Sequence, residues 1–289
     1  MKIVVTPSPA TLGAVVQGVD LRALDEVAFA AIEDAFHDHA VLVFPEQHLD
    51  DLEQAAFGHR FGRFERGMGN LGDATVWPIS NVQANGLLAD PTGPLAAVLA
   101  GNQEWHTDSS YHEVGAKVSV LSARVVSSSG GETEWADMRA AYDALDAADR
   151  ALIEGRDAAH SIVYSQRKVG AGADFWTEAD KASMEAVRHP LVLVHPVTRR
   201  RALYVGRHAH AVSGLDAHTS SALVDRLNAF AGQPPRVFTH RWEPGDLAVW
   251  DNRCVLHRGR PWPMDEPRVL RHTRIAGDGP NSWAVVTQP

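Results

Sequence analysis

The hydrophobic and polar positions in the first half of the chain predict two helices and a buried strand. Apolar residues recur at helical spacing over 26–40, and the β-branched run 41–44 is typical of a buried strand. Asp50 and Glu53 have the spacing of a capping box, so a second helix is expected to begin there. Residues 63–104 show no sustained period and are rich in turn-forming residues, which predicts long loops with short strands.

The second half is dominated by short strand-like runs. An apolar, β-branched segment at 118–126 precedes a turn at 127–131, and a helix is expected over 138–153. Further strands are expected over 190–195, 202–206, 236–242, 246–250 and 268–275, with one more helix over about 219–231. Helices first and many strands later favour a single α+β domain over 1–289, mainly β, built around a sandwich or open barrel.

Composition and charge narrow the range of partners. Hydrophobic residues make up 45% of the 289 positions and charged residues 22%, which is an ordinary globular mix. The net charge of −9 and the absence of a basic stripe argue against nucleic acid as a partner. The chain shows neither a signal peptide nor an apolar run of roughly 20 residues, so we expect a cytoplasmic protein without membrane contact. The single cysteine, Cys254, fits a reducing compartment and is expected to be a buried thiol.

The segment from Trp105 to Tyr111 contains a candidate metal motif, His106-Thr107-Asp108. In an extended strand the residues i and i+2 point to the same face, so this imidazole and this carboxylate could bind one ion. With 15 histidines and 36 acidic residues in the chain, about two such pairs are expected by chance, and two occur. The other pair is His48 and Asp50, and Asp50 is better explained as a helix cap.

A third ligand would complete a facial triad of two histidines and one carboxylate, which leaves open positions on iron(II). His257 is the candidate, because it follows a predicted strand that runs into a turn. His208 and His210 could form a competing pair. They lack a neighbouring carboxylate, so packing or substrate contact is an equally good interpretation of these two residues.

The last predicted strand carries candidate anion-binding groups. Strand alternation places Arg268, His272 and Arg274 on one face and Arg271 on the other. A dicarboxylate such as 2-oxoglutarate would need a forked guanidinium at its distal end while its keto acid chelates the metal. Surface charges on an edge strand remain an equally simple explanation.

Four motifs together resemble the TauD/TfdA family of iron(II)/2-oxoglutarate-dependent dioxygenases, over nearly the whole chain. The segments that carry the resemblance are 13–21, the metal motif at 105–110, Gly-Gly-Glu-Thr at 130–133, and 245–260. The last of these, together with 137–145, is most similar to the 2,4-dichlorophenoxyacetate dioxygenase branch.

The resemblance implies a double-stranded β-helix (jelly roll) core with flanking helices. It implies that His106, Asp108 and His257 bind iron(II), and that Thr133 and Arg268 bind 2-oxoglutarate. It further implies that O2 is consumed, a substrate C–H bond is hydroxylated, and succinate and CO2 are released.

One position departs from the family pattern. In the family that the chain resembles, a second arginine usually stands four residues beyond Arg268, where this chain has His272, whose imidazole offers no fork. Arg271 or Arg274 could compensate. The expected substrate is a small anionic molecule, aryloxyalkanoate-like, whose ether bond is cleaved if the hydroxylated carbon bears the ether oxygen. Its contacts are expected from the loops at 63–104, from Ser109 and Ser110, and from the region of Arg207 and His208.

Other functions remain open from sequence alone. The same chemistry could act on an alkyl sulfate or sulfonate, an amino acid or a natural-product intermediate. From different classes, the same ligands could hold zinc in a hydrolase, or the chain could be a non-catalytic binding module. Thr133 and Arg268 have no role in either of these last two, so their joint presence favours the oxygenase. The family favours a homo-oligomer, although no oligomer interface can be recognised in the sequence.

Overall fold

The computed structural model describes residues 2–65, 74–170 and 185–279, and over these ranges the chain is mainly β. Among them, the largest sheet has seven strands in the order β1 (Val4–Pro7), β2 (Ala14–Gln17), β3 (Val41–Phe44), β13 (Leu247–Asp251), β5 (Ala116–Val125), β15 (Val269–Ala276) and β4 (Trp77–Ser80). Every residue of β3 and β13 is buried, because these strands lie inside the sheet and both faces are covered. This explains why the two strands have continuous apolar runs.

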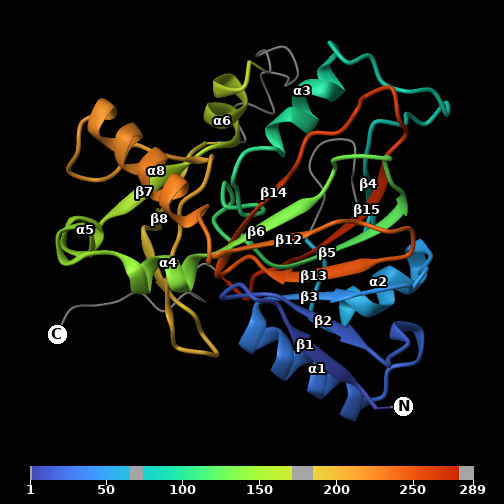
Figure 1. The fold of residues 1–289 in the computed structure, drawn as a ribbon. Helices are drawn as coiled ribbons and strands as arrows, with labels where there is room; N and C mark the ends of the chain where they lie inside the picture. Colours follow the sequence, from blue (N-terminus) through green and yellow to red (C-terminus); the bar gives the residue numbers. More distant parts are fainter. Residues whose placement is uncertain (1, 66–73, 171–184, 280–289) are drawn as a thin grey trace.

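A second, antiparallel sheet faces part of the first. Its described strands are β12 (Val237–His240), β6 (Thr133–Asp137) and β14 (Val255–Gly259). The rings of Trp135 on β6 and Trp250 on β13 lie 5.8 Å apart, so side chains of the two sheets meet. The chain passes from β13 to β14 through the tight turn 252–254, and Figure 1 shows β6 and β14 above β5 and β13.

Smaller sheets and helices flank this core. They comprise β7 (Asp157–His160), β8 (Val187–Pro190), β9 (Val192–Val194), β10 (Arg201–Leu203), β11 (Ala209–His210), α4 (Met138–Ala144), α5 (Ala147–Ile153) and α8 (Ala217–Ala231). Helix α4 contacts both β10 and α8, and these elements occupy the left-hand side of Figure 1. No described helix combines the length and apolar character that crossing a membrane requires.

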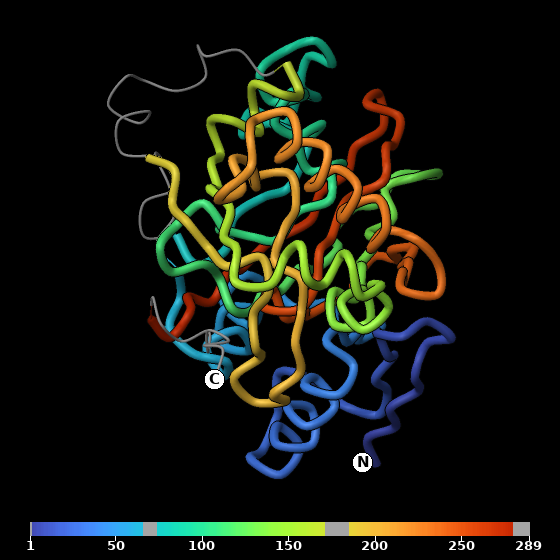
Figure 2. Tube along the Cα trace, turned by 90° about the vertical axis from the view of Figure 1, so that its left-hand side faces the viewer, coloured from blue at the N-terminus to red at the C-terminus, as the bar shows by residue number. Residues whose placement is uncertain are grey.

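Further helices pack on the seven-stranded sheet and on the opposite side of the molecule. η1 (Leu21–Ala23) contacts α2 (Asp51–His59), which contacts β5 and β15, and α1 (Glu26–His39) contacts β3 and β13. The predicted capping box is confirmed, because the Glu53 amide donates to the Asp50 carboxylate and the Asp50 amide donates to Glu53, both at 2.8 Å. Helix α3 (Pro94–Gly101) contacts α6 (Ile162–Lys168), and Figures 1 and 2 both place this pair opposite α1.

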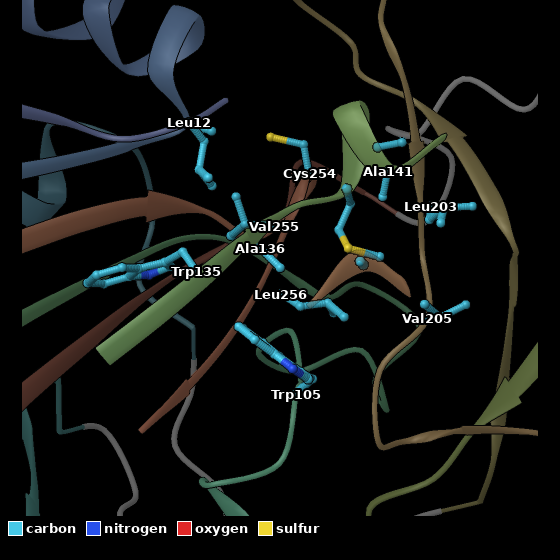
Figure 3. Packing of buried hydrophobic residues seen from close by; sticks show 14 of the residues in the cluster. Leu12, Trp105, Trp135, Ala136, Ala141, Leu203, Val205, Cys254, Val255 and Leu256 are labelled. Carbon is cyan, nitrogen blue, oxygen red and sulfur yellow. The ribbon is translucent and has the colours of Figure 1, made fainter. Parts of the chain in front are cut away.

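The larger buried cluster joins the second sheet to the flanking helices. Figure 3 shows Trp135 and Ala136 of β6 beside Val255 and Leu256 of β14, and the sulfur of Cys254 buried nearby. Cys254 is buried, as expected from the sequence, and burial raises the pKa of its thiol. A second cluster lies between the seven-stranded sheet and α1.

The sequence-based elements needed three corrections. The helix predicted over 138–153 is two helices, because Leu145 is extended and Asp146 begins a new one, accepting a hydrogen bond from the Asp149 amide. Within the described part of 63–104, α3 is a helix where loops and short strands were expected. It has Pro94 at its first turn and no side-chain cap, so it lacks the usual start signal. The strand predicted over 190–195 is interrupted at Leu191: Pro190 is the last residue of β8, and β9 follows at Val192–Val194.

Candidate active site

His106, Asp108 and His257 converge as the sequence predicted. One ligand atom from each lies within 4.8 Å of the other two. The backbones of His106 and His257 form an antiparallel bridge, with the His106 amide 3.0 Å from the His257 carbonyl and the reverse pair at 2.7 Å. The context differs from the prediction: His106 lies in an isolated bridge and Asp108 in a turn, and His257 lies in the middle of β14, after the turn. Ser109, with φ of +58°, continues that turn.

Hydrogen bonds orient the first two of these side chains. Nδ1 of His106 donates to the Glu104 carbonyl at 2.7 Å, which leaves Nε2 with its lone pair free for a metal. The Ser119 hydroxyl donates to Oδ2 of Asp108 at 2.6 Å, and the Asn252 side-chain oxygen accepts from the Asp108 amide at 3.2 Å. Two imidazoles and one oriented carboxylate form a donor set that fits a divalent transition metal with open coordination positions.

The protonation states of the three side chains also suit metal binding. Burial lowers the pKa of His106 and lowers that of His257 well below its ordinary value, so both rings are neutral near pH 7. Burial alone would raise the pKa of Asp108, but the charged groups around it, Arg274 among them, outweigh this effect and hold that pKa well below its usual range. All three groups are therefore in the forms that donate electron pairs to a metal.

Three of the four candidate residues in and just before the last strand, β15, line the cavity beside these groups. Arg268, His272 and Arg274 line the cavity, as strand alternation predicted. Arg271 does not: it points to the other face, where its guanidinium pairs with Asp51 on α2. Arg271 as a substrate-binding candidate was therefore wrong.

His272 and Arg274 are both held by neighbours at the centre of the site. The His272 ring stacks on Trp250 at 5.8 Å, and its Nε2 lies 3.4 Å from Oδ2 of Asp108. Arg274 donates to the Ser109 hydroxyl at 2.7 Å, and its Nε lies 3.8 Å from a carboxylate oxygen of Glu65. Arg274 is therefore a cation whose charge is already balanced.

Thr133 and Arg268 both line the cavity. The Trp242 ring nitrogen donates to the Thr133 hydroxyl oxygen at 2.9 Å, so the hydroxyl proton is available to a ligand. Arg268 is 4% exposed, donates to the Gly131 carbonyl at 2.8 Å, and lies over the Trp262 ring. Within the described ranges no carboxylate lies within ion-pair distance of Arg268, and burial lowers its pKa to about 10. A carboxylate ligand is the partner that this buried cation lacks.

The two other predicted substrate residues, Ser109 and His208, also line the cavity. The Ser109 hydroxyl donates to Glu65 at 2.7 Å and accepts from Arg274, so both of its roles are taken. Nδ1 of His208 lies 2.8 Å from the Ser165 hydroxyl, and its ring is 5.0 Å from that of Tyr111. His210, its suggested partner, instead stacks on Tyr164.

The cavity has a volume of about 320 Å³ and unites the triad with the co-substrate candidates. Apolar side chains form much of its lining, among them Trp77, Ile79, Val98, Leu99, Ile162 and Leu270. The cavity therefore offers an apolar surface beside the metal candidates, together with cationic side chains.

Several contributing residues were not identified from sequence. Ser119 interrupts the apolar run of β5, and a polar residue at a buried strand position is a signal that could have been followed. Asn252 lies in a turn, where asparagine is ordinary, so nothing in the sequence marks its contact with Asp108. Trp242 and Glu65 likewise act through contacts between distant segments.

Comparisons with known proteins agree with this geometry. The family described as "Taurine catabolism dioxygenase TauD, TfdA family" matches residues 5–274. The chain is 47% identical over 281 residues to an (S)-phenoxypropionate/alpha-ketoglutarate-dioxygenase of Delftia acidovorans, covering 94% of each chain. It is 38% identical to an alpha-ketoglutarate-dependent 2,4-dichlorophenoxyacetate dioxygenase of Cupriavidus pinatubonensis, covering 96% of this chain and 99% of that protein.

A solved structure is similar over its full length. The crystal structure of AAD-2 in complex with Mn(II) and N-oxalylglycine superposes with a TM-score of 0.90 at 36% identity, covering 100% of both chains. These matches confirm the predicted family and its 2,4-dichlorophenoxyacetate branch, and with them iron(II), 2-oxoglutarate and O2 as the cofactor and co-substrates. The chain belongs to the TauD/TfdA family and is an iron(II)- and 2-oxoglutarate-dependent dioxygenase.

Proposed function

We propose that this dioxygenase hydroxylates a small aryloxyalkanoate at the carbon that bears the ether oxygen. The observation that carries the proposal is the cavity of about 320 Å³, which is lined by the triad, by cationic groups and by apolar side chains. An aryl ring suits that lining, and a carboxylate suits the cations. The relatives named for phenoxypropionate and 2,4-dichlorophenoxyacetate support the same substrate class.

His106, Asp108 and His257 are proposed to hold the iron. Their ligand atoms lie within 4.8 Å of one another, and the hydrogen bonds from Ser119 and to the Glu104 carbonyl fix two of the three. When bound there, iron(II) supplies the activation of O2 that couples 2-oxoglutarate decarboxylation to substrate hydroxylation. A facial arrangement leaves the opposite coordination positions to small ligands.

Thr133 and Arg268 are proposed to bind the distal carboxylate of 2-oxoglutarate. Arg268 offers a forked cation held by Gly131, and Thr133 offers a hydroxyl proton directed by Trp242. N-oxalylglycine, the ligand of the similar AAD-2 structure, has the same two carboxylates as 2-oxoglutarate with N–H in place of one methylene. That similarity supports a dicarboxylate here.

The overall reaction balances for an ether substrate. One oxygen atom of O2 enters succinate as 2-oxoglutarate loses CO2, and the other enters the substrate C–H bond as a hydroxyl. A hydroxyl on the carbon next to the ether oxygen makes a hemiacetal or hemiketal, which breaks its C–O bond to release a phenol and a carbonyl product. The residues of the chain need only orient the substrate and exclude water.

The other substrate classes suit the cavity less well than an aryloxyalkanoate, and the core fold, location, partners and oligomeric state of the protein are proposals. Alkyl sulfates lack the aryl group that would fill the apolar lining, and amino acids and natural-product intermediates are not the substrates named for the relatives that are 38–47% identical. The family argues against a zinc hydrolase or a non-catalytic binding module. Two facing sheets support a double-stranded β-helix within a single domain of residues 1–289. Cytoplasmic location, independence from nucleic acid and membranes, and a homo-oligomeric state rest on sequence and family.

Anaerobic reconstitution tests this function. With iron(II) and 2-oxoglutarate the protein is expected to show the weak visible charge-transfer band of the chelate, and Asp108→Ala is expected to lose it. After oxygen is admitted, phenoxyacetate and (S)-2-phenoxypropionate should yield phenol and succinate in equal amounts. A folded, iron-loaded protein without the band would sink the metal and co-substrate assignments. Succinate without phenol would sink the substrate class.

A further inference from the structure

Three arginines line the cavity, and their neighbours distinguish them. Arg274 has Glu65 as its counter-charge. Arg268 lines the cavity together with Thr133, and these two residues are proposed to bind 2-oxoglutarate. Arg207, which follows β10, is the third. Its side chain makes no hydrogen bond or ion pair with any part of the chain that the structure describes, and its Nε and Nη2 are shielded from solvent.

The surroundings of Arg207 hold its guanidinium in place without satisfying it. Its backbone amide donates to the Trp105 carbonyl at 2.8 Å, which ties it beside the strand-like segment of His106. The guanidinium lies against Gly101 at the end of α3, so closely that a side chain on Gly101 would collide with it. The partial negative charge of that helix end favours a cation, but the guanidinium N–H donors have no hydrogen-bond partner among the described residues.

Leaving this cation unpaired has an energetic cost. Burial lowers the pKa of Arg207 to about 10, with Glu104 and Tyr111 offsetting the effect in part. A desolvated guanidinium without a counter-ion is unfavourable unless a ligand supplies the missing charge. Arg207 remains charged at neutral pH all the same, so an anionic ligand is the complement.

The reaction brings two anionic molecules into one cavity, and the described lining offers two arginines without a counter-ion. Arg268 serves the dicarboxylate. We infer that Arg207 binds the carboxylate of the primary substrate. The sequence suggested that His272 on β15 leaves this carboxylate without an arginine, and Arg207, which follows β10, provides one. This inference rests on the proposed aryloxyalkanoate function and names the residue that reads the acid group.

The cavity lining holds both polar and apolar side chains. Asn102 and Gln103 follow Gly101, against which the Arg207 guanidinium lies, and Pro78 and Ile79 belong to β4. A substrate held by its carboxylate at Arg207 would keep its ring among apolar side chains and its ether carbon between the two. Positioning by a charged anchor at one end is how a small molecule acquires a single orientation over a metal.

The test compares an acid with its uncharged amide. Calorimetric titration of the anaerobic complex with iron(II) and 2-oxoglutarate gives dissociation constants for phenoxyacetate and for phenoxyacetamide, which has nearly the same shape. In Arg207→Met, binding of phenoxyacetate should weaken roughly 10- to 100-fold, as expected for loss of a charged hydrogen-bonded pair. Binding of the amide should change by less than about two-fold, and Arg207→Lys should recover part of the affinity for the acid.

Two further variants keep the test independent of folding defects. Gly101→Ala should displace the guanidinium without removing it and should weaken acid binding in the same direction. Arg271→Met, which removes an arginine that pairs with Asp51 outside the cavity, should leave both ligands unaffected. The charge-transfer band should titrate with 2-oxoglutarate as in the unaltered protein in every one of these variants.

The outcomes separate this inference from the proposed function. Equal loss of acid and amide binding in Arg207→Met would overturn the inference, as would weaker 2-oxoglutarate binding with the acid unaffected. An unaltered protein that binds phenoxyacetate through Arg207 but releases no phenol would support the inference and overturn the proposed substrate class.

Discussion

His272 Nε2 lies 3.4 Å from the Oδ2 atom of Asp108. The ring is fixed by stacking on Trp250 at an interplanar angle of 10°. Its Nε2 atom is therefore held beside the triad carboxylate. A histidine here stabilises the ionised form of Asp108 and leaves the substrate anion to another residue.

Replacing His272 by phenylalanine tests that role. The variant keeps a ring that can stack on Trp250 but removes the nitrogen beside Asp108. Because residues that orient metal ligands typically affect affinity 10- to 100-fold, iron(II) affinity should fall by roughly that factor. Titration of iron(II) under anaerobic conditions, followed by the charge-transfer band, measures it. Unchanged iron affinity would show that His272 acts elsewhere.

Gly131→Ala is expected to raise the KM for 2-oxoglutarate. Gly131 has φ of +73°, and a Cβ there would lie 2.8 Å from Nε of Arg268, so the guanidinium must shift. A displacement of this kind should cost roughly ten-fold in KM. Gly155→Ala is the matched control, because Gly155 has φ of +72° and nothing within 4 Å of the added atom. Both should lose similar stability, and only the first should change 2-oxoglutarate kinetics.

Trp242 and Thr133 should act as a unit on co-substrate binding. Trp242→Phe removes the donor that occupies the Thr133 oxygen, so the hydroxyl proton loses its fixed direction. We expect an increase of a few-fold in the 2-oxoglutarate dissociation constant, corresponding to about 0.5–1.5 kcal/mol for one neutral hydrogen bond. Thr133→Val should show a larger increase. In the double variant the two effects should not add, and additive effects would contradict the coupling.

The Asp251 carboxylate should make stability fall in acid. Burial alone would raise its pKa, but Arg253, with Nη2 2.7 Å away, and His195 hold it far below the usual range. A carboxylate with a depressed folded pKa contributes stability that is complete above its unfolded pKa of about 3.9 and is lost as pH falls below that value.

Asp251→Asn should therefore flatten the acid limb of the stability curve. Below about pH 4 the unaltered protein should lose about 1.4 kcal/mol per pH unit more than the variant, which should already be less stable at pH 7 because Arg253 loses its partner. Urea unfolding at several pH values measures both effects. The exposed Asp34→Asn is the control, and identical slopes for Asp251→Asn and the unaltered protein would contradict the expectation.

Much of the local structure could be predicted from patterns of neighbouring residues. The capping box at Asp50, the continuous strand at Val41–Phe44 and the alternation that separates Arg271 from Arg268 are all local, and the structure confirms them. The break at Leu145 and the helix α3 were missed, because both depend on how weak local signals pack against the rest of the protein.

The sequence by itself determined which chemical groups the protein has and, through its motifs, the family of its reaction. It placed His106, Asp108 and His257 together because spacing and motif are properties of the chain. Only the tertiary structure decided which charges are already paired. Arg274 meets Glu65 and Arg271 meets Asp51, while Arg207 and Arg268 face the cavity without a carboxylate among the described residues. Ion pairing depends on distances between segments far apart in sequence, and those distances exist only in the folded chain.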